Sequence, residues 1–175
     1  MAKSNRQRIG DGLEIVLQAL VPFVEGAFID AYGDDWLDKV NAGLKQPMKK
    51  KGKLGAAWDN HKLLTCMIAH WTVFSSKLSK SHKSYLHEML DVRNSWAHDE
   101  AFSYDQTYRA LDTMKLLVAA ASQGDEAQEL EKLADEAMRV RFTEQRRGIT
   151  RKIKALDISP MKGLRPWREV ITPHP

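Results

Sequence analysis

The sequence predicts an all-α protein, an antiparallel bundle of four to five main helices followed by a C-terminal arm that contains prolines. Three observations predict this fold class. Apolar residues recur at spacings of three and four, no alternation of period two lasts more than a few residues, and serine or aspartate precedes several apolar stretches. The chain has 175 residues, 43% of them hydrophobic and 29% charged, which is enough to bury a core of its own.

The first helix is expected over about residues 11–31. Pro22 lies inside this stretch and should kink or break the helix, and Gly33 should end it. Asp34 can then cap a short helix. The apolar stripes of these two helices comprise Leu13, Val16, Leu17, Leu20, Val24, Ala27 and Phe28, and then Trp36, Leu37 and Val40.

Residues 46–55 are rich in lysine, glycine and proline and predict an exposed loop. A helix over about 56–78 should follow, and Ser81 or Ser84 should cap another that reaches about Ala97. Their core-facing residues are Leu64, Met67, Ile68, Trp71, Phe74 and Leu78, and then Tyr85, Leu86, Met89, Leu90, Val92, Trp96 and Ala97.

A capping box of Ser103 and Gln106 predicts the start of a helix that runs to about Ser122. After a turn at 123–125, the last clear helix should cover about 126–147, acidic at its start and basic at its end, which suits the helix dipole. We therefore divide the chain into a helical bundle, residues 1–147, and a linker or arm, residues 148–175, toward a missing downstream domain.

Composition excludes several classes of protein. No apolar run approaches the span of a bilayer, and the N-terminus leads into no apolar core of the signal-peptide type, so we expect no membrane partner. The single cysteine, Cys66, excludes an internal disulfide and lies beside an apolar stripe as a small buried residue, so a cytoplasmic location is expected. No metal-binding motif is present, and no cofactor is predicted.

The net charge is only +4, but the basic residues cluster. One block lies at residues 48–53, and a longer one covers 139–154 with Glu144 as its only acid. Such clusters predict nucleic-acid contact, and the alternative is a solvated helix face or a link to the next domain. The candidate nucleic-acid-binding residues are Arg139, Arg141, Arg146, Arg147, Arg151 and Lys152.

The stretch Arg93-Asn94-Ser95-Trp96-Ala97-His98 is the strongest candidate for chemistry. Arginine matches phosphate oxygens with a rigid fork of donors, and histidine moves protons near neutral pH. Arg93 follows the apolar residues of its helix at core spacing, whereas His98 lies about 140° further round an ideal helix. The two side chains can still cooperate if the helix ends near Ala97, if a long phosphate backbone touches both, or if a second protomer supplies one of them.

A purely structural role is the alternative interpretation of this pair. Arg93 could brace the bundle by pairing with Asp91 or Asp99, and His98 could cap the carbonyls at the end of its helix.

The pattern Arg-Asn-x-x-x-His at the end of an apolar helix resembles the R-x4-6-H signature of HEPN domains, and the wider chain is similar to the Swt1-like branch of that superfamily over roughly residues 9–122. The segments that carry the resemblance are ALVPFVE at 19–25, YGDDW at 32–36, WTVF at 71–74, DVRNSWAH at 91–98, FS at 102–103 and YRALD at 108–112.

The resemblance implies metal-independent endoribonuclease activity, in which a ribose 2′-hydroxyl attacks the adjacent phosphate and leaves a 2′,3′-cyclic end. His98 would then be the general base or acid, Arg93 would hold the phosphate, and Asn94 would orient the histidine or donate to the phosphate. HEPN domains typically form dimers in which both Arg/His pairs line one cleft. Some carry a tyrosine, the target of a partner nucleotidyltransferase, where this chain has Glu100, and the acids Asp99 and Glu100 disfavour an approaching phosphate.

Residues 163–175 look like the lead into a large AAA-type ATPase of prokaryotic defence islands, so we expect RNA, a second copy and this ATPase as partners. One alternative is a non-catalytic domain that dimerises or docks nucleic acid or partner subunits. A helical module that binds nucleotides is a third.

Overall fold

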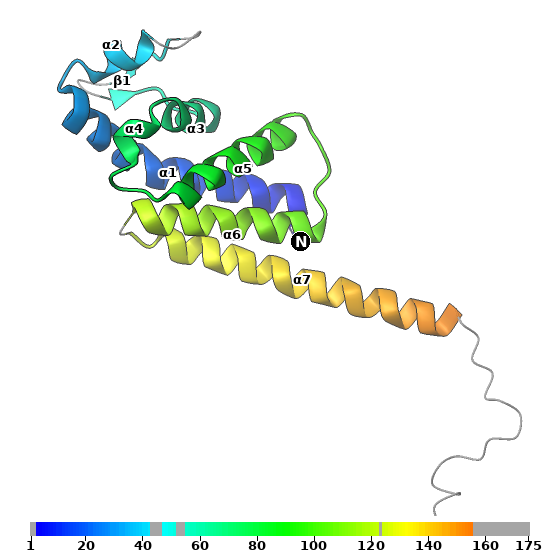
Figure 1. Cartoon of the computed structure of the whole chain (residues 1–175). Helices are drawn as coiled ribbons and strands as arrows, with labels where there is room; N and C mark the ends of the chain where they lie inside the picture. The colour runs from blue at the N-terminus through cyan, green and yellow to red at the C-terminus, as the bar shows by residue number, and fades with distance from the viewer. Residues whose placement is uncertain (1–2, 43–46, 52–54, 123, 156–175) are drawn as a thin grey trace, which may run out of the picture. The chain divides into compact units, whose positions relative to one another are not determined.

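The computed structural model describes residues 3–42, 47–51, 55–122 and 124–155. These residues form seven helices and one short two-stranded ladder, which confirms the predicted all-α bundle (Figure 1). The chain divides into two compact units, Met1–Arg139 and Val140–Pro175. The predicted boundary after residue 147 stays a prediction, and most of the predicted arm, residues 156–175, lies outside the described residues.

Helix α1 (Asn5–Tyr32) begins earlier than the apolar pattern predicted, because Ser4 and Gln7 form a capping box at its start. Of the kink or break expected at Pro22, the break is wrong, and the kink stays a prediction. The helix continues through this exposed proline, since buried residues on both sides, Leu20 and Val24, lie on one stripe that packing holds in place. Gly33, with φ 75°, ends the helix as predicted.

By length and composition alone, α1 is apolar enough to cross a membrane, with a mean hydropathy of 1.6 in its most apolar window. This corrects the expectation that no apolar run approaches such a span. Within the first unit 44% of that window is buried, because the apolar stripe of α1 packs on its neighbouring helices.

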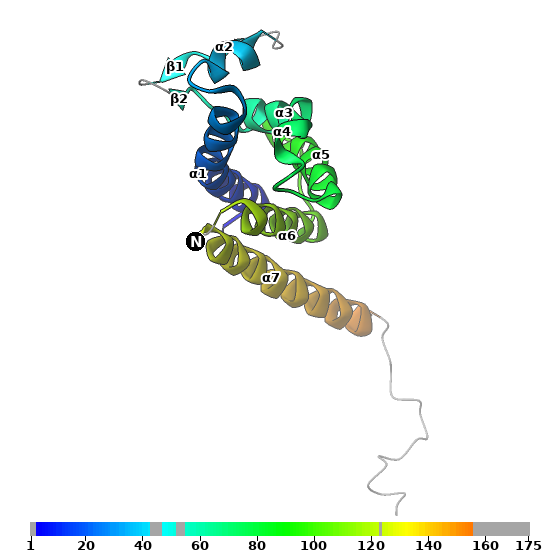
Figure 2. The same cartoon turned by 60° about the vertical axis from the view of Figure 1, so that its left-hand side comes forward.

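Four helices of the first unit close a ring around the core (Figure 2). Helix α1 packs on α6 (Tyr104–Ala121) and on α3 (Asn60–Ala69), and α5 (Lys80–Ala97) packs on the same two helices from the other side. The largest fully buried apolar side chains are Ile9, Leu20, Phe28, Trp36, Leu63, Leu64, Met67, Phe74, Leu86, Met89 and Leu111.

The single helix predicted over 56–78 is interrupted at His70, which divides it into α3 and the short α4 (Trp71–Phe74). The backbone of His70 leaves the helical region, with φ −101° and ψ 34°. Its ring packs edge-on against Phe28, with 5.5 Å between centroids, and its Nδ1 lies 3.4 Å from the hydroxyl of Tyr32. Contacts with the end of α1 therefore override the helical periodicity at this point.

The predicted loop at 46–55 is wrong in part. Strands β1 (Lys50–Lys51) and β2 (Gly55–Ala56) pair antiparallel, and Met48 is buried rather than exposed. Asn41, at the end of α2 (Trp36–Asn41), holds the backbone of Met48 through two hydrogen bonds of 2.7 and 3.1 Å. One oxygen of Glu25 on α1 accepts from the amide of Ala56 and the indole of Trp58, at 2.9 and 2.8 Å.

The later helices follow the predicted order. Ser79, not Ser81 or Ser84, precedes α5, where His82 Nδ1 accepts from the Ser79 amide at 3.0 Å. The capping box of Ser103 and Gln106 at α6 is confirmed. Helix α7 (Glu126–Ala155) runs past the predicted end at 147.

The first part of α7 belongs to the core of the first unit, where Leu130, Ala134 and Ala137 are buried. The guanidinium of Arg8, only 2% exposed, donates to Glu136 at 3.0 Å and to the carbonyl of Lys3 at 2.6 Å. This buried cation ties α7 to the first turns of α1.

We predict that Glu25→Ala lowers the free energy of unfolding by about 2 kcal/mol, because two donors lose their shared acceptor. Glu25→Gln keeps an acceptor oxygen and should cost about half as much. Urea denaturation measures both changes, with Glu14→Ala, at an exposed site on the same helix, as control. A cost for Glu25→Ala no larger than that of the control would contradict the role of this carboxylate.

Stability should also fall in mild acid because of His70. Burial lowers the pKa of His70 below its ordinary value of 6.5, so the unfolded chain binds this proton more tightly than the folded one. The free energy of unfolding therefore decreases as the pH falls through and below 6.5, and His70→Gln should weaken this dependence. Urea denaturation from about pH 5 to 7.5 measures it, with exposed His61→Gln as control, and equal slopes in wild type and His70→Gln would refute the prediction.

Candidate functional site

Helix α5 carries the candidate residues at its C-terminal end. Its buried residues, Leu86 and Met89, face the core, and the same stripe reaches solvent at Arg93 and Trp96, which are half-buried. The helix ends at Ala97, and His98 is its C-cap, as the first of the predicted arrangements requires.

The chain leaves α5 through a Schellman turn. The amide of Glu100 donates to the carbonyl of Ser95 at 3.0 Å, and the amide of Asp99 donates to that of Trp96 at 3.4 Å. Between them Asp99 adopts φ 59°, the left-handed conformation that glycine normally supplies at this position. A non-glycine residue in this conformation lowers the free energy of unfolding by about 1 kcal/mol.

Arg93, Asn94 and His98 gather on this last turn. Arg93 is half-buried at the edge of the core rather than in the interior, and the ring of His98 is exposed. Asn94 lies between them: its Oδ1 is 3.4 Å from Arg93 Nη1, and its carbonyl accepts the amide of His98 at 3.0 Å. Neither the guanidinium nor the imidazole is enclosed, so solvent reaches both.

The two reactive side chains do not meet within one chain. Among the described residues, no hydrogen bond joins Arg93 to His98, and the His98 ring has no side-chain partner. The alternative in which Arg93 pairs with Asp91 or Asp99 is also not observed. A single copy thus places a guanidinium and an imidazole on one turn without a hydrogen bond between them.

The carboxylate of Asp99 is neutralised by Arg6 of α1. Arg6 Nη2 lies 2.6 Å from Asp99 Oδ1, and the guanidinium carbon lies over the ring of Trp96, 5.2 Å from its centroid, as a cation–π contact. Of the two acids expected to disfavour phosphate, only Glu100 lacks such a cation in the described part of the chain. The Asp99 side chain is 85% exposed, so the ion pair contributes about 0.5 kcal/mol, less than the left-handed turn costs.

A hollow of about 480 Å³ borders Trp96, between α1 and the start of α3. Arg6, Gly10 and Asn60 line it, whereas Arg93 and His98 do not. A Cβ at position 10 would stand 3.3 Å from the indole nitrogen, so glycine allows α1 to approach Trp96 closely. The predicted core packing of Trp96 is therefore confirmed in part, since the ring contacts α1 and also borders solvent.

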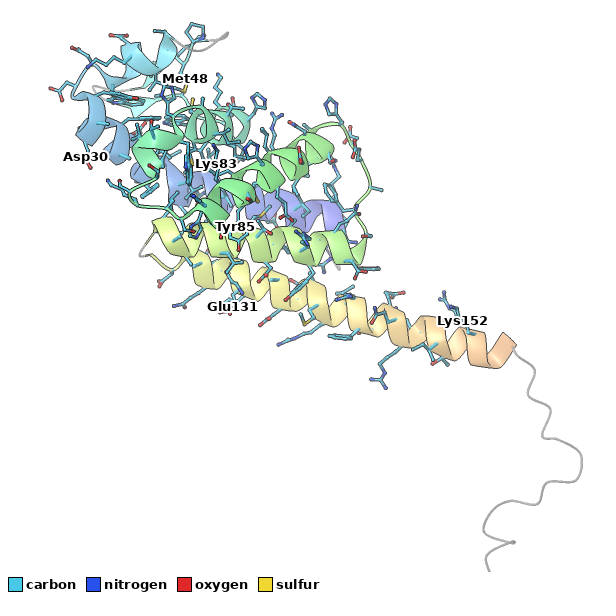
Figure 3. The ribbon with its side chains drawn as sticks, in the orientation of Figure 1. Asp30, Met48, Lys83, Tyr85, Glu131 and Lys152 are labelled. Carbon is cyan, nitrogen blue, oxygen red and sulfur yellow. The ribbon has the colours of Figure 1, made fainter. Side chains whose placement is uncertain are left out.

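The second candidate group, the basic residues of α7, is spread around the helix. Arg146, Arg147 and Arg151 line one groove of about 430 Å³ together with two threonines, 143 and 150. Lys152 does not line this groove and stands out from the helix into solvent (Figure 3). Arg139 and Arg141 do not line it either, and both have interaction partners.

No group of three or more histidine, cysteine, aspartate or glutamate side chains in the described ranges could hold a metal ion. The thiol of Cys66 is fully buried, as predicted, and burial raises its pKa to about 11. The thiol is therefore protonated and unreactive at neutral pH.

Sequence reasoning missed Arg6 as a neighbour of the site. The sequence offered one indirect signal. Asp99 follows a predicted helix end, where glycine or asparagine is expected, and an aspartate there indicates that its side chain has a binding partner. The partner of its carboxylate lies in another helix, which spacing alone cannot identify.

Comparison with known families places these residues in context. A model of Swt1-like HEPN domains matches residues 11–122, well over half of the 175 residues. No curated protein and no solved structure matches the chain. The matched region starts within α1, ends at the C-cap of α6, and contains all of α5 and its final turn. The chain therefore belongs to the Swt1-like HEPN family.

Proposed function

We propose that the chain is a metal-independent endoribonuclease domain. One observation carries the proposal: in a Swt1-like HEPN domain, half-buried Arg93, Asn94 and exposed His98 lie together on the last turn of α5. A fixed cation can stabilise the charge that develops on a phosphate, and an imidazole in reach of solvent can transfer a proton, so together they suit phosphodiester cleavage without a metal ion.

In the proposed reaction the ribose 2′-oxygen forms a bond to the adjacent phosphorus, and the bond from phosphorus to the 5′-oxygen breaks. His98 either removes the proton of the 2′-hydroxyl or supplies one to the leaving 5′-oxygen, and water or the His98 of the second copy carries out the other proton transfer. Arg93 binds the non-bridging oxygens as their negative charge grows. Asn94, whose Oδ1 faces Arg93, directs its NH₂ group toward phosphate or imidazole. The products are a 2′,3′-cyclic phosphate and a 5′-hydroxyl.

We also propose that two copies form the working cleft. The separation of Arg93 from His98 within one chain favours this arrangement, since a second copy can supply the complementary group. RNA and a second copy are accordingly the partners we propose, and the ATPase partner, the defence role and the cytoplasmic location stay predictions. The segment that suggested the ATPase, residues 163–175, lies outside the described residues.

The basic groove of α7 is the proposed contact for the RNA backbone. Arg146, Arg147 and Arg151 recur at helical spacing on one face, where cations can follow successive phosphates. Glu144 pairs with Arg147 at 2.6 Å, so this arginine must exchange one anion for another on binding.

A non-catalytic role in dimerisation or docking is the second candidate function. The observation that favours it is the same separation: in the described part of the chain no side chain is hydrogen-bonded to the His98 ring. Both candidates use the turn after α5, and they differ in whether RNA is cut there.

The nuclease proposal predicts that purified protein cleaves mixed RNA equally well with and without EDTA. Arg93→Ala and His98→Ala should each lose at least about 10²-fold in rate, because each removes one catalytic group. His87→Ala, at an exposed position on the same helix, is the matched control. Cleavage that survives in both active-site variants, or no cleavage by the wild type, would rule the proposal out.

Binding to single-stranded RNA should depend on salt through α7. The triple variant Arg146→Glu, Arg147→Glu and Arg151→Glu should reduce the slope of log affinity against log salt by about 2, at ~0.7 for each lost phosphate contact. Fluorescence anisotropy in a series of salt concentrations measures the slope. Lys132→Glu, which changes an exposed charge in the first unit, should leave it unchanged, and an unaltered slope in the triple variant would remove this contact.

Sedimentation velocity separates the two candidate functions. If Arg93→Glu dissociates a wild-type dimer and no RNA is cut by either protein, the docking function holds. A wild type that is monomeric at all concentrations would exclude the shared cleft.

A further inference from the structure

We propose that Arg6, Asp99 and Trp96 form a clamp that positions His98. The inference rests on the proposed nuclease function and adds two positioning residues to it, Arg6 and Asp99, neither of which touches the reacting atoms. It is carried by an ion pair, a cation–π contact and a left-handed backbone residue, all within two residues of His98 or in contact with such residues.

The backbone of Asp99 is the first observation. Its φ of 59° belongs to the conformation that glycine adopts freely at this position of a Schellman turn. Aspartate adopts this conformation at a cost in folding free energy, and its highly exposed ion pair with Arg6 stabilises the fold by less than that cost. The ion pair therefore offsets only part of that cost, which leaves the carboxylate a role in holding the local geometry of the turn.

The second observation is the set of contacts between the start of α1 and the segment around His98. Arg6 binds the carboxylate at 2.6 Å while its guanidinium lies over the Trp96 ring at 5.2 Å, so one side chain contacts residues on both sides of His98. The side-chain Nδ2 of Asn5, next to Arg6, donates to the carbonyl of Phe102 at 3.0 Å and fixes the chain beyond the turn. The first turn of α1 thus holds the segment in which His98 lies.

His98 depends on this segment more than a buried histidine would. Its ring is exposed and has no side-chain partner in the described residues, and its backbone is fixed through the amide hydrogen bond to Asn94. Where the ring lies therefore depends on the turn that carries its backbone. A looser turn would leave the fold intact and reduce the fraction of time in which the imidazole is aligned with the phosphate.

The test compares Asp99→Gly with the wild type. Glycine keeps the left-handed turn without its cost and removes the clamp, so the free energy of unfolding should be equal or higher. We expect kcat for cleavage of an RNA oligonucleotide to fall about tenfold, with KM equal or lower because a negative charge is gone. Arg6→Gln should match this loss, Arg6→Lys should recover part of it, and Arg6→Gln combined with Asp99→Gly should lose no more than either alone.

Asp30 and Lys77 provide a matched control. They form another exposed ion pair, 2.9 Å long, at the opposite end of α1, where Figure 3 labels Asp30. Asp30→Asn should leave kcat unchanged, whereas Asp99→Asn should lower it. Equal kcat values in Asp99→Gly and the wild type, or equal losses in Asp30→Asn and Asp99→Asn, would overturn the clamp.

A second readout separates the clamp from the nuclease proposal. NMR of protein with labelled histidine reports the side-chain torsion of His98 through three-bond couplings. We expect one dominant rotamer in the wild type and averaging among rotamers in Asp99→Gly. If the wild type cuts no RNA, the nuclease proposal fails and this comparison alone decides the clamp, which unchanged couplings would refute.

Discussion

The first unit depends on the burial of α1. Every other helix that packs in the ring, and the short helices α2 and α4 as well, contacts this one element. Its C-terminal half holds the ladder through Glu25 and the break in α3–α4 through Phe28, and its N-terminal half reaches the end of α5 through Arg6. A helix packed on several sides must be apolar around much of its surface, which explains why α1 also meets a composition criterion for crossing membranes.

The fold class was predictable because helical periodicity survives along most of the chain, and capping residues mark several helix starts. The errors fall where tertiary contacts outweigh local pattern. His70 sits in an uninterrupted apolar stripe, yet its ring packs against α1 and turns the chain. Met48 lies among lysines and is nevertheless buried, because the side chain of Asn41 satisfies its backbone. The spacing of residues along the chain predicts neither of these two contacts.

The candidate site divides in the same way. That Arg93, Asn94 and His98 lie close together was predictable, because they share the end of one helix, and the matched family model spans them. Arg6 and Asp99 could not, since their contact joins the first turn of α1 to the last turn of α5. The basic run of α7 was predicted as a cluster, but only coordinates separate the arginines that line one groove from those already engaged elsewhere.

The burial of Cys66 makes the chain convenient for spectroscopy. The sequence holds no other thiol, and this one is fully enclosed and protonated at neutral pH, so maleimide and methanethiosulfonate reagents do not reach it. A cysteine introduced at an exposed position of α5, such as Ser84, is then the sole site for a nitroxide label. Pulsed electron resonance between two labelled copies would give their separation without removal of any native residue.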